Sequence, residues 1–295
     1  SLHDALPILQ MSAVADERHI PTASDRLRRN PVAIVSACVV VVMVLGAVFA
    51  PVVSGYAYDA VDRQHILVGP MAGHPLGTDN QGQDVAARLL YGARISLAIG
   101  IIVEAIEVLI GVTLGLLAAY KGGYWDTLLM RVTDAMFAFP DLLFAILLVG
   151  ILRPTSAFAS FLTVFVALAL VNWPSMARIV RGQALSLREK EFVEAARAIG
   201  APDRQIILRH LLPNILSPIL VAATVDIANV VLAEATLSFL GIGIQPPFPS
   251  WGRMISDALP YLRSAPMLLA YPSAALALLV LAFNFLGDAL RDALD

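Results

Sequence analysis

Charged side chains are scarce in this sequence: Asp, Glu, Lys and Arg make up 15% of the 295 residues, whereas 58% are hydrophobic. In soluble globular domains, about a quarter of the residues are charged. A chain of this length cannot bury so much apolar surface in a core of its own. Most of that surface must therefore face lipid or other membrane helices, which excludes an ordinary soluble protein.

Several motifs of catalysis and metal binding are also missing. The single cysteine, Cys38, excludes an intrachain disulfide and is expected to be a small, buried apolar residue. No G-x-x-x-x-G-K-[ST] phosphate loop is present, so the chain cannot itself be an ATPase, and no G-x-S-x-G or H-E-x-x-H motif occurs. The scattered arginines do not form a nucleic-acid face. The histidines are His3, His19, His65, His74 and His210. They show no metal-ligand spacing and predict no metal site, although His65 and His74 could touch an external substrate.

Six apolar segments have the length that a bilayer requires, and they predict an all-α membrane protein with six transmembrane helices. They cover residues 32–54, 95–120, 135–152, 157–173, 215–235 and 266–286. The first is longer than the apolar region of a signal peptide, so we interpret it as a retained anchor. The first ten residues lack a methionine, and we expect the native chain to begin at Met11.

The distribution of basic residues predicts the orientation. With a cytoplasmic N-terminus, the inside segments hold fourteen of the twenty Lys and Arg residues. This bias places both termini in the cytoplasm. The expected order is a cytoplasmic tail over 1–31, an anchor over 32–54, an external loop over 55–94, a helical membrane domain over 95–287 and a cytoplasmic tail over 288–295.

The cytoplasmic connection over 186–213 reads as two short amphipathic helices with a corner between them. Its apolar residues at helical spacing are Phe192, Val193, Ala196 and Ile199. Gly200 suits a left-handed cap of the first helix, and Pro202 suits the first turn of the second. The pattern alone fits either a helix lying at the lipid headgroups or a bent element that transmits the movement of a partner.

Six residues of this connection carry a family resemblance. They are Glu194, Ala195, Ala196, Gly200, Leu212 and Pro213. Their pattern resembles the EAA loop of bacterial ABC import permeases, with His210 where the general pattern has isoleucine. The resemblance implies a cytoplasmic coupling helix that docks into a groove of a separate ATPase.

Longer matches narrow the resemblance to one branch of that family. They lie at 76–84, 91–97, 134–140, 234–247 and 251–252. These stretches are similar to the C-type permease subunit of dipeptide, oligopeptide and nickel importers, in which arginine is more usual at the Gln83 position. The resemblance covers residues 26 to the C-terminus. It implies the ABC importer type I permease fold in the inner membrane, with the transmembrane domain over 95–287.

The same resemblance implies the partners and cofactors. We expect a homologous B-type permease, two cytoplasmic ABC ATPases and an extracytoplasmic solute-binding protein. ATP and Mg²⁺ would be used by the ATPases, and this chain would hold no cofactor. The cargo stays open among dipeptides, longer peptides, glutathione-like thiols and nickel chelates.

Two ionisable or polar pairs fall inside the predicted spans, at Glu104 with Glu107 and at Asp226 with Asn229. A charged residue at the centre of a span costs roughly 2.5–3.5 kcal/mol, so such residues are functional candidates. Each pair could line a translocation pathway or could serve helix packing. Glu234 is expected to fix the external loop that follows it. Gly111 and Gly115 permit close packing within the subunit or against a second permease.

Two rival functions are compatible with a membrane protein of this size. A proton-coupled secondary transporter would use Glu104, Glu107 or Asp226 as proton carriers and would need no ATPase. An intramembrane enzyme would need a catalytic constellation within the spans, and the sequence contains none that is convincing.

Overall fold

The computed structural model describes residues 23–294, and the predicted non-native stretch over 1–10 lies outside them. Every regular element in the described part is helical, apart from three isolated bridges in one loop. The elements are α2 (Ala23–Arg29), α3 (Pro31–Val48), α4 (Ala50–Val53), α5 (Val85–Lys121), α6 (Gly123–Phe137), α7 (Asp141–Leu152), α8 (Ala157–Arg188), α9 (Glu191–Ala198), α10 (Asp203–Gln205), the π-helical turn η1 (Ile206–Leu211), α11 (Leu212–Phe239), α12 (Trp251–Ala258), the 3₁₀ turn η2 (Leu259–Tyr261) and α13 (Met267–Leu294).

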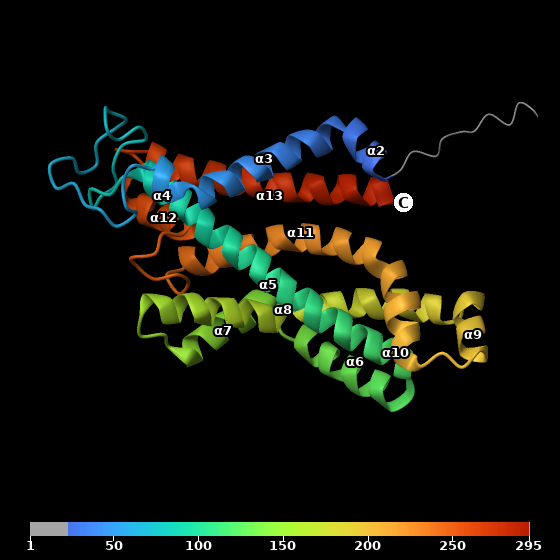
Figure 1. The fold of residues 1–295 in the computed structure, drawn as a ribbon. Helices are drawn as coiled ribbons and strands as arrows, with labels where there is room; N and C mark the ends of the chain where they lie inside the picture. Colours follow the sequence, from blue (N-terminus) through green and yellow to red (C-terminus); the bar gives the residue numbers. More distant parts are fainter. Residues whose placement is uncertain (1–22, 295) are drawn as a thin grey trace, which may run out of the picture.

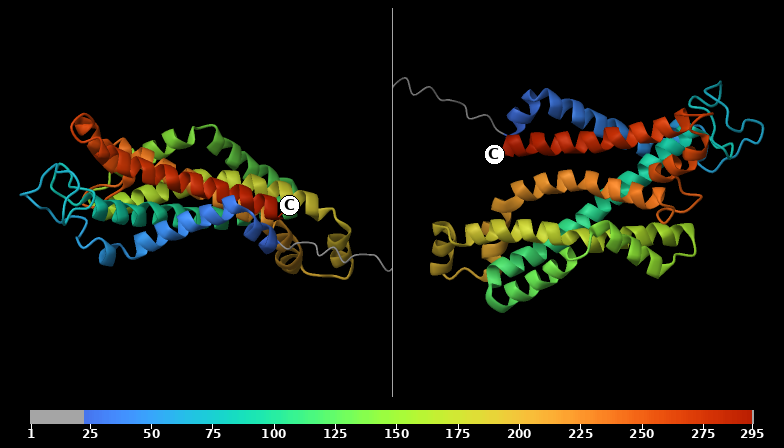
Figure 2. Two further views of the ribbon diagram at one scale, coloured as in Figure 1. Left: turned by 90° about the horizontal axis from the view of Figure 1, so that it is seen from above. Right: turned by 180° about the vertical axis from the view of Figure 1, so that it is seen from behind.

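The long helices run along a common direction and form layers (Figure 1). Helices α3 and α13 pack together on one side, α11 lies in the middle, and α8 lies with α6 and α7 on the other side. Helix α5 crosses these layers obliquely and contacts α3, α8 and α11. The loop over 54–84 lies at one end of the molecule, and α9 lies at the other end together with the end of α13 (Figure 2).

Local capping explains where the long helices begin. The Asn30 side chain accepts hydrogen bonds from the N–H groups of Val32 and Ala33, and proline stands at the first position of α3. The Asp84 carboxylate accepts a hydrogen bond of 2.7 Å from the N–H of Ala87 in the first turn of α5. Side-chain oxygens thus satisfy amide groups that the first turn leaves free.

Within residues 23–294, five helical segments are long and apolar enough to cross a membrane: α3, α5, α8, the continuous stretch Asp203–Phe239, and α13. Counting α6 and α7 as one broken span gives six, as predicted. The predicted segment over 135–152 is not one continuous helix, because α6 ends at Phe137, α7 begins at Asp141 and the two helices bend by 84°. Pro140 at the start of α7 lacks the N–H that would continue a helix. The twelve residues of α7 span only ~18 Å, too short for a bilayer core of about 30 Å.

Several helices extend beyond the apolar segments that were predicted as spans. Helix α5 begins at Val85, so the end of the predicted external loop over 55–94 is helical, and α8 continues to Arg188 instead of ending at 173. Helix α13 continues to Leu294, through the predicted tail over 288–295. The 32 residues of α8 are ~48 Å long, which exceeds a bilayer core, so part of α8 projects beyond it. Apolar runs show the membrane portion of a helix, and polar residues at the surface can continue it.

Helix α6 is fastened to α8 by ion pairs. Arg181 makes a bidentate contact with Asp126 at 2.5 and 2.7 Å, and Arg178 pairs with Asp134. The Arg178 guanidinium also lies 4.0 Å from the centre of the Phe137 ring. These contacts hold the first part of the broken span against the long helix α8.

Two of the glycines of α5, Gly111 and Gly115, bring this helix close to α8. A Cβ atom on Gly111 would lie 2.6 Å from Cβ of Met176, and one on Gly115 would lie 2.6 Å from the Ala177 carbonyl oxygen. The sequence left open whether this glycine pair packs within the subunit or against a second permease. In the structure it packs against α8 of the same chain. The absence of side chains lets the two backbones approach closely.

Candidate functional site

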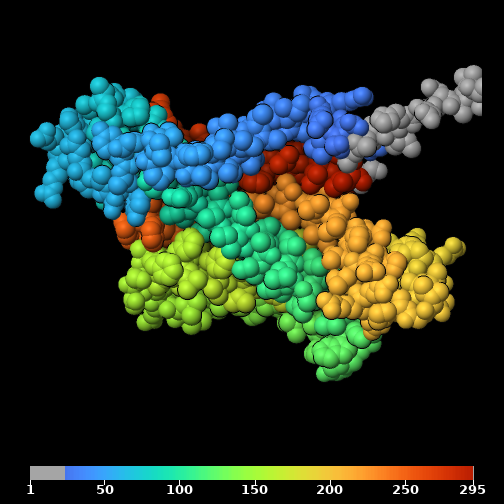
Figure 3. Space-filling view, in the orientation of Figure 1, coloured from blue at the N-terminus to red at the C-terminus, as the bar shows by residue number. Residues whose placement is uncertain are grey.

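The segment that contains α9 connects two of the long helices at one end of the molecule. It follows α8 directly and leads through α10 and η1 into α11. The space-filling view places α9 and α10 at the opposite end from the loop over 54–84 (Figure 3). Any force on α9 is therefore applied to the ends of two long helices at once.

One face of α9 is built into the core of the chain. Val193 and Ala196 are buried, and they belong to a cluster that includes residues of α5, α8, η1 and α11. Other buried members are Leu116, Val180, Ala184, Ile206, Leu211 and Ile215. The Ala196 side chain thus contacts this chain's own core.

The opposite face of α9 is open. Glu194 and Ala195 are exposed, as are two large apolar residues, Phe192 at 41% and Ile199 at 84%. The prediction grouped these two with Val193 and Ala196 on one apolar face. At 100° per residue the buried stripe is centred between Val193 and Ala196, and Phe192 and Ile199 fall at its edge. An apolar side chain this exposed at the end of a short helix is available to a partner surface.

The corner after α9 has the geometry predicted for Gly200. Its φ is +79°, in the left-handed region, and its N–H donates to the Arg197 carbonyl at 2.9 Å. The N–H of Ala201 donates to the Ala196 carbonyl at 3.0 Å. Together these bonds form a Schellman cap, which ends the helix sharply. Pro202 precedes α10 as its N-cap, one position earlier than predicted.

The remaining two residues of the resemblance, Leu212 and Pro213, are the first residues of α11. Leu212 packs partly against the cluster that holds α9, and Pro213 is exposed. Pro213 has no N–H to donate, and it closely follows the π-helical turn η1, whose hydrogen-bonding pattern differs from that of an α-helix. The six residues therefore extend from the open face of α9 to the start of a long helix.

A second set of contacts holds the corner to α5, and the sequence did not indicate it. Asp203 accepts hydrogen bonds from the Tyr120 hydroxyl at 2.8 Å and from the Lys121 ammonium at 2.9 Å. The Arg197 guanidinium lies 5.5 Å from the centre of the Tyr120 ring. More than 80 residues separate Asp203 from its two partners, so no local pattern could have predicted the contact. The end of α5 and both sides of the corner are thus linked.

An open pocket lies between α9 and the end of α5. Its lining residues are Tyr120, Lys121, Arg188, Glu189, Glu194, Arg197 and Asp203. Arg188 also donates a hydrogen bond of 2.8 Å to the Ala119 carbonyl. The pocket therefore presents charged side chains of both signs beside the exposed residues of α9.

The acidic residues of the spans occupy two different environments. Glu104 and Glu107 are 3% and 2% exposed, and both Glu104 carboxylate oxygens and Oε1 of Glu107 have no hydrogen-bond partner among the described residues. Asp226 is half-buried and accepts a hydrogen bond of 3.0 Å from the exposed Asn229 amide. Only the α11 pair reaches the surface of the chain.

Glu234 holds the loop after α11, as predicted. Its buried carboxylate accepts hydrogen bonds from Ser96 at 3.0 Å, Ser238 at 2.7 Å and Ser250 at 2.8 Å. These serines belong to α5, to α11 and to the N-cap of α12. A Cβ on Gly252 would lie 2.0 Å from the Ala235 carbonyl oxygen, so α12 also approaches α11 closely. One carboxylate therefore connects three elements at the end opposite α9.

Comparison with known proteins gives two family matches. Residues 111–295 match the family described as binding-protein-dependent transport system inner membrane component. Residues 22–70 match the N-terminal transmembrane domain of oligopeptide transport permease C.

Individual relatives agree with these matches. The dipeptide transport system permease protein DppC of Alkalihalophilus pseudofirmus is 42% identical over 97% of this chain and 91% of its own length. The glutathione transport system permease protein GsiD of Escherichia coli is 43% identical over 99% of this chain and 94% of its own length. An inward-facing structure of the MetNI methionine ABC transporter has the same fold, with a TM-score of 0.56, 21% identity and coverage of 70% of this chain and 96% of that chain. The chain belongs to the family of binding-protein-dependent transport system inner membrane components, as a permease of the C type found in peptide importers.

Proposed function

We propose that this chain is a permease subunit of an ATP-driven importer of short peptides, including glutathione-like peptides. It works in the cytoplasmic (inner) membrane with both termini on the cytoplasmic side. The relatives named after dipeptide and glutathione transport favour a peptide cargo over the nickel chelates that the sequence also allowed. The observation that carries the coupling part of the proposal is the exposed apolar and acidic face of α9, directly backed by the chain's own core.

The partners follow from this role. A homologous B-type permease completes the pathway, two cytoplasmic ABC ATPases bind and hydrolyse ATP with Mg²⁺, and an extracytoplasmic solute-binding protein delivers the peptide. Phe192 and Ile199 contribute apolar contact to one ATPase, and Glu194 contributes charge at the rim of that contact. Gly200 and Pro213 set the shape of the corner that the ATPase must fit.

The packing of α9 supports a lever mechanism. When the ATPases close on ATP, they displace α9, and Val193 and Ala196 transfer this movement to the cluster shared by α5, α8 and α11. The contacts of Asp203 with Tyr120 and Lys121 add a second connection to α5. The long helices then tilt between two states whose populations nucleotide controls.

The polar residues of the spans divide into two roles. Asp226 and Asn229 line the translocation pathway, because they reach the surface of α11 within a predicted span. Glu104 and Glu107 lie behind them inside the chain, where their unpaired oxygens can polarise the pathway without contacting cargo. Substitution of Asn229 should therefore alter cargo affinity more directly than substitution of Glu104.

The test is uptake by the complete complex in proteoliposomes. Labelled dipeptide should accumulate when ATP is available to the ATPases, and a protonophore should leave uptake unchanged. Accumulation that needs a proton gradient and persists without ATP would instead identify a secondary transporter.

The coupling role is tested with a charge reversal in the same system. Glu194→Lys should abolish ATP-driven uptake, while Asp292→Lys, at an exposed position near the end of α13, is the control and should leave uptake unchanged. Subunit stoichiometry is measured for each variant. A fully assembled Glu194→Lys complex with wild-type uptake would disprove the coupling role of α9.

A further inference from the structure

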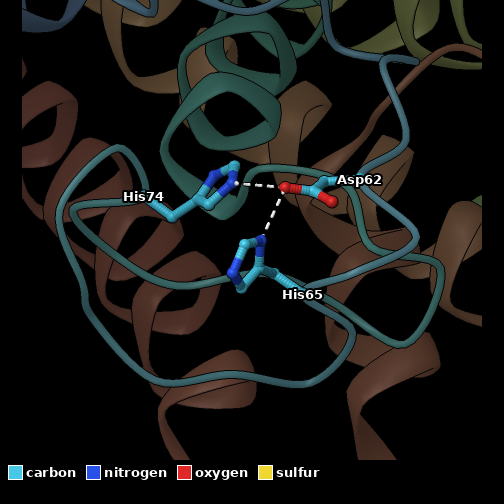
Figure 4. Close-up of side chains that lie close together, drawn as sticks. All are labelled: Asp62, His65 and His74. Carbon is cyan, nitrogen blue, oxygen red and sulfur yellow. Dashed lines mark hydrogen bonds and ion pairs between the residues drawn. The ribbon is translucent and has the colours of Figure 1, made fainter.

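Three potential metal ligands meet in the loop over 54–84, at the end of the molecule opposite α9. They are Asp62, His65 and His74, whose side chains point toward one another (Figure 4). Nδ1 of His65 lies 2.7 Å from Oδ2 of Asp62, and Nε2 of His74 lies 3.5 Å from the same oxygen. All three ligand atoms lie within 4.8 Å of one another. Their positions in the sequence, three and nine residues apart, did not predict this convergence.

Asp84 sets the orientation of the His74 ring. Its Nδ1 lies 2.9 Å from Oδ2 of Asp84, and the other Asp84 oxygen caps the first turn of α5 through the N–H of Ala87. A carboxylate at Nδ1 holds the proton there, which leaves the lone pair of Nε2 directed at Asp62 and His65. This carboxylate–histidine pairing is the usual support of a metal-bound imidazole. The His74 ring is also buried and stacked on Tyr56, with the ring centres 4.9 Å apart.

The backbone around the ligands is held in place by the fold of the loop. Met71 and His74 exchange two hydrogen bonds of 3.0 Å, and the N–H of Asp62 donates to the Gly82 carbonyl at 2.8 Å. Gly82 has a φ of +77°, and a Cβ there would lie 2.3 Å from the Asp62 carbonyl oxygen. The ligands therefore stand on a tightly packed backbone, as a preorganised site requires.

We propose that Asp62, His65 and His74 bind one divalent transition-metal ion, with Zn²⁺ as the representative. Two imidazoles and one carboxylate suit Zn²⁺ and its neighbours in the transition series, whereas Mg²⁺ and Ca²⁺ prefer oxygen ligands alone. Ligands about 2.0–2.2 Å from a tetrahedral Zn²⁺ lie roughly 3.3 Å apart. The measured separations of 2.7 and 3.5 Å lie on either side of that value.

The chemistry and exposure of the three groups support an ion that exchanges with solvent. Asp62 offers a carboxylate oxygen, and His65 and His74 each offer an imidazole nitrogen. The Asp62 and His65 side chains are 35% and 38% exposed, while His74 is buried. The fourth coordination position therefore faces outward, toward water or a partner. A bound ion would fasten the loop to the first turn of α5 through His74 and Asp84.

The test is Zn²⁺ binding by the complete complex, purified in detergent and stripped with a chelator. Metal content and competition with a chromophoric chelator give the stoichiometry and the dissociation constant. We expect one Zn²⁺ for each copy of this chain at the site, unaffected by a large excess of Mg²⁺. His65→Ala should weaken binding at least ~100-fold, because it removes one of three ligands from an exposed position that the fold does not need. Asp84→Asn should weaken it roughly 10- to 100-fold, as loss of a supporting carboxylate does.

His210→Gln is the matched control, because that histidine lies in η1, at the opposite end of the molecule from the loop over 54–84. It should leave the dissociation constant unchanged within about twofold, a difference too small to reflect a lost ligand. Equal Zn²⁺ affinity of the wild type and His65→Ala would overturn the site, as would failure of the wild type to retain one equivalent. Unchanged affinity in Asp84→Asn would overturn the proposed orientation of His74. Peptide uptake is not part of the readout, so this result is independent of the transport function.

Discussion

The side chain of Ile199 offers the sharpest test of the proposed coupling surface. It is 84% exposed at the end of α9 and contributes little to the stability of the chain alone. Full burial of such a side chain contributes about 1.5–3 kcal/mol. If an ATPase covers it, Ile199→Ala should lose a large part of that free energy. The dissociation constant of the ATPase should then rise at least several-fold and at most about 150-fold, since each 1.4 kcal/mol is a factor of ten.

The assay is titration of the purified ATPase onto the permease pair in lipid nanodiscs, with affinity read by biolayer interferometry. Ile66→Ala is the matched control, because this isoleucine is also strongly exposed but lies in the loop at the opposite end. It should leave ATPase affinity within about twofold of wild type, which is less than 0.5 kcal/mol. Thermal unfolding of both variants should match the wild type. Wild-type ATPase affinity in Ile199→Ala would refute the claim that the ATPase buries this face of α9.

Three glycine substitutions test the backbone geometry. Gly200→Ala should cost about 1–2 kcal/mol through its left-handed φ of +79° and reduce co-purification of the ATPase, whereas Gly200→Asn should largely preserve it. Gly252→Ala should destabilise the protein by at least about 1–3 kcal/mol, because the new Cβ meets a backbone oxygen at 2.0 Å. The measurement is thermal unfolding, and Gly69→Ala, in open space, is the control. Gly111→Ala should lower the unfolding midpoint through its contact with α8, while Gly150→Ala, in open space on α7, should raise stability by about 0.5–1 kcal/mol. Equal midpoints for those two variants would contradict the packing of α5 on α8.

The predictions that succeeded depend on local signals. Apolar runs located the long helices because a bilayer demands about 20 consecutive apolar residues. The left-handed cap at Gly200 could be predicted because glycine is the residue for which that conformation costs least. Glu234 was correctly assigned to the following loop, where it accepts hydrogen bonds from three serines. These features are set by properties of single residues or of short segments.

The failures concern contacts between segments that are distant in sequence. Amphipathic spacing placed Ala196 and Ile199 on one face, but burial depends on where α5, α8 and η1 meet α9. Pro140 signals a break in the apolar segment over 135–152, but the sequence does not give the angle of 84° between α6 and α7. The convergence of His65 and His74 depends on a loop whose fold is set by glycine turns and by the cap of α5. No periodicity in the sequence reports such geometry.

Helix α5 links the two ends of the molecule that the proposals concern. Its first turn is capped by Asp84, the residue that orients His74, and its last turn carries Tyr120 and Lys121, which hold Asp203 beside α9. The 37 residues between these points form one helix of roughly 55 Å. A rigid element of that length carries displacement from one end to the other, so a change at the α9 corner must move the first turn of α5 unless the helix bends. Zn²⁺ affinity measured with and without ATP should therefore differ if α5 moves as one body, and equal affinities would show that the movement is absorbed along the helix.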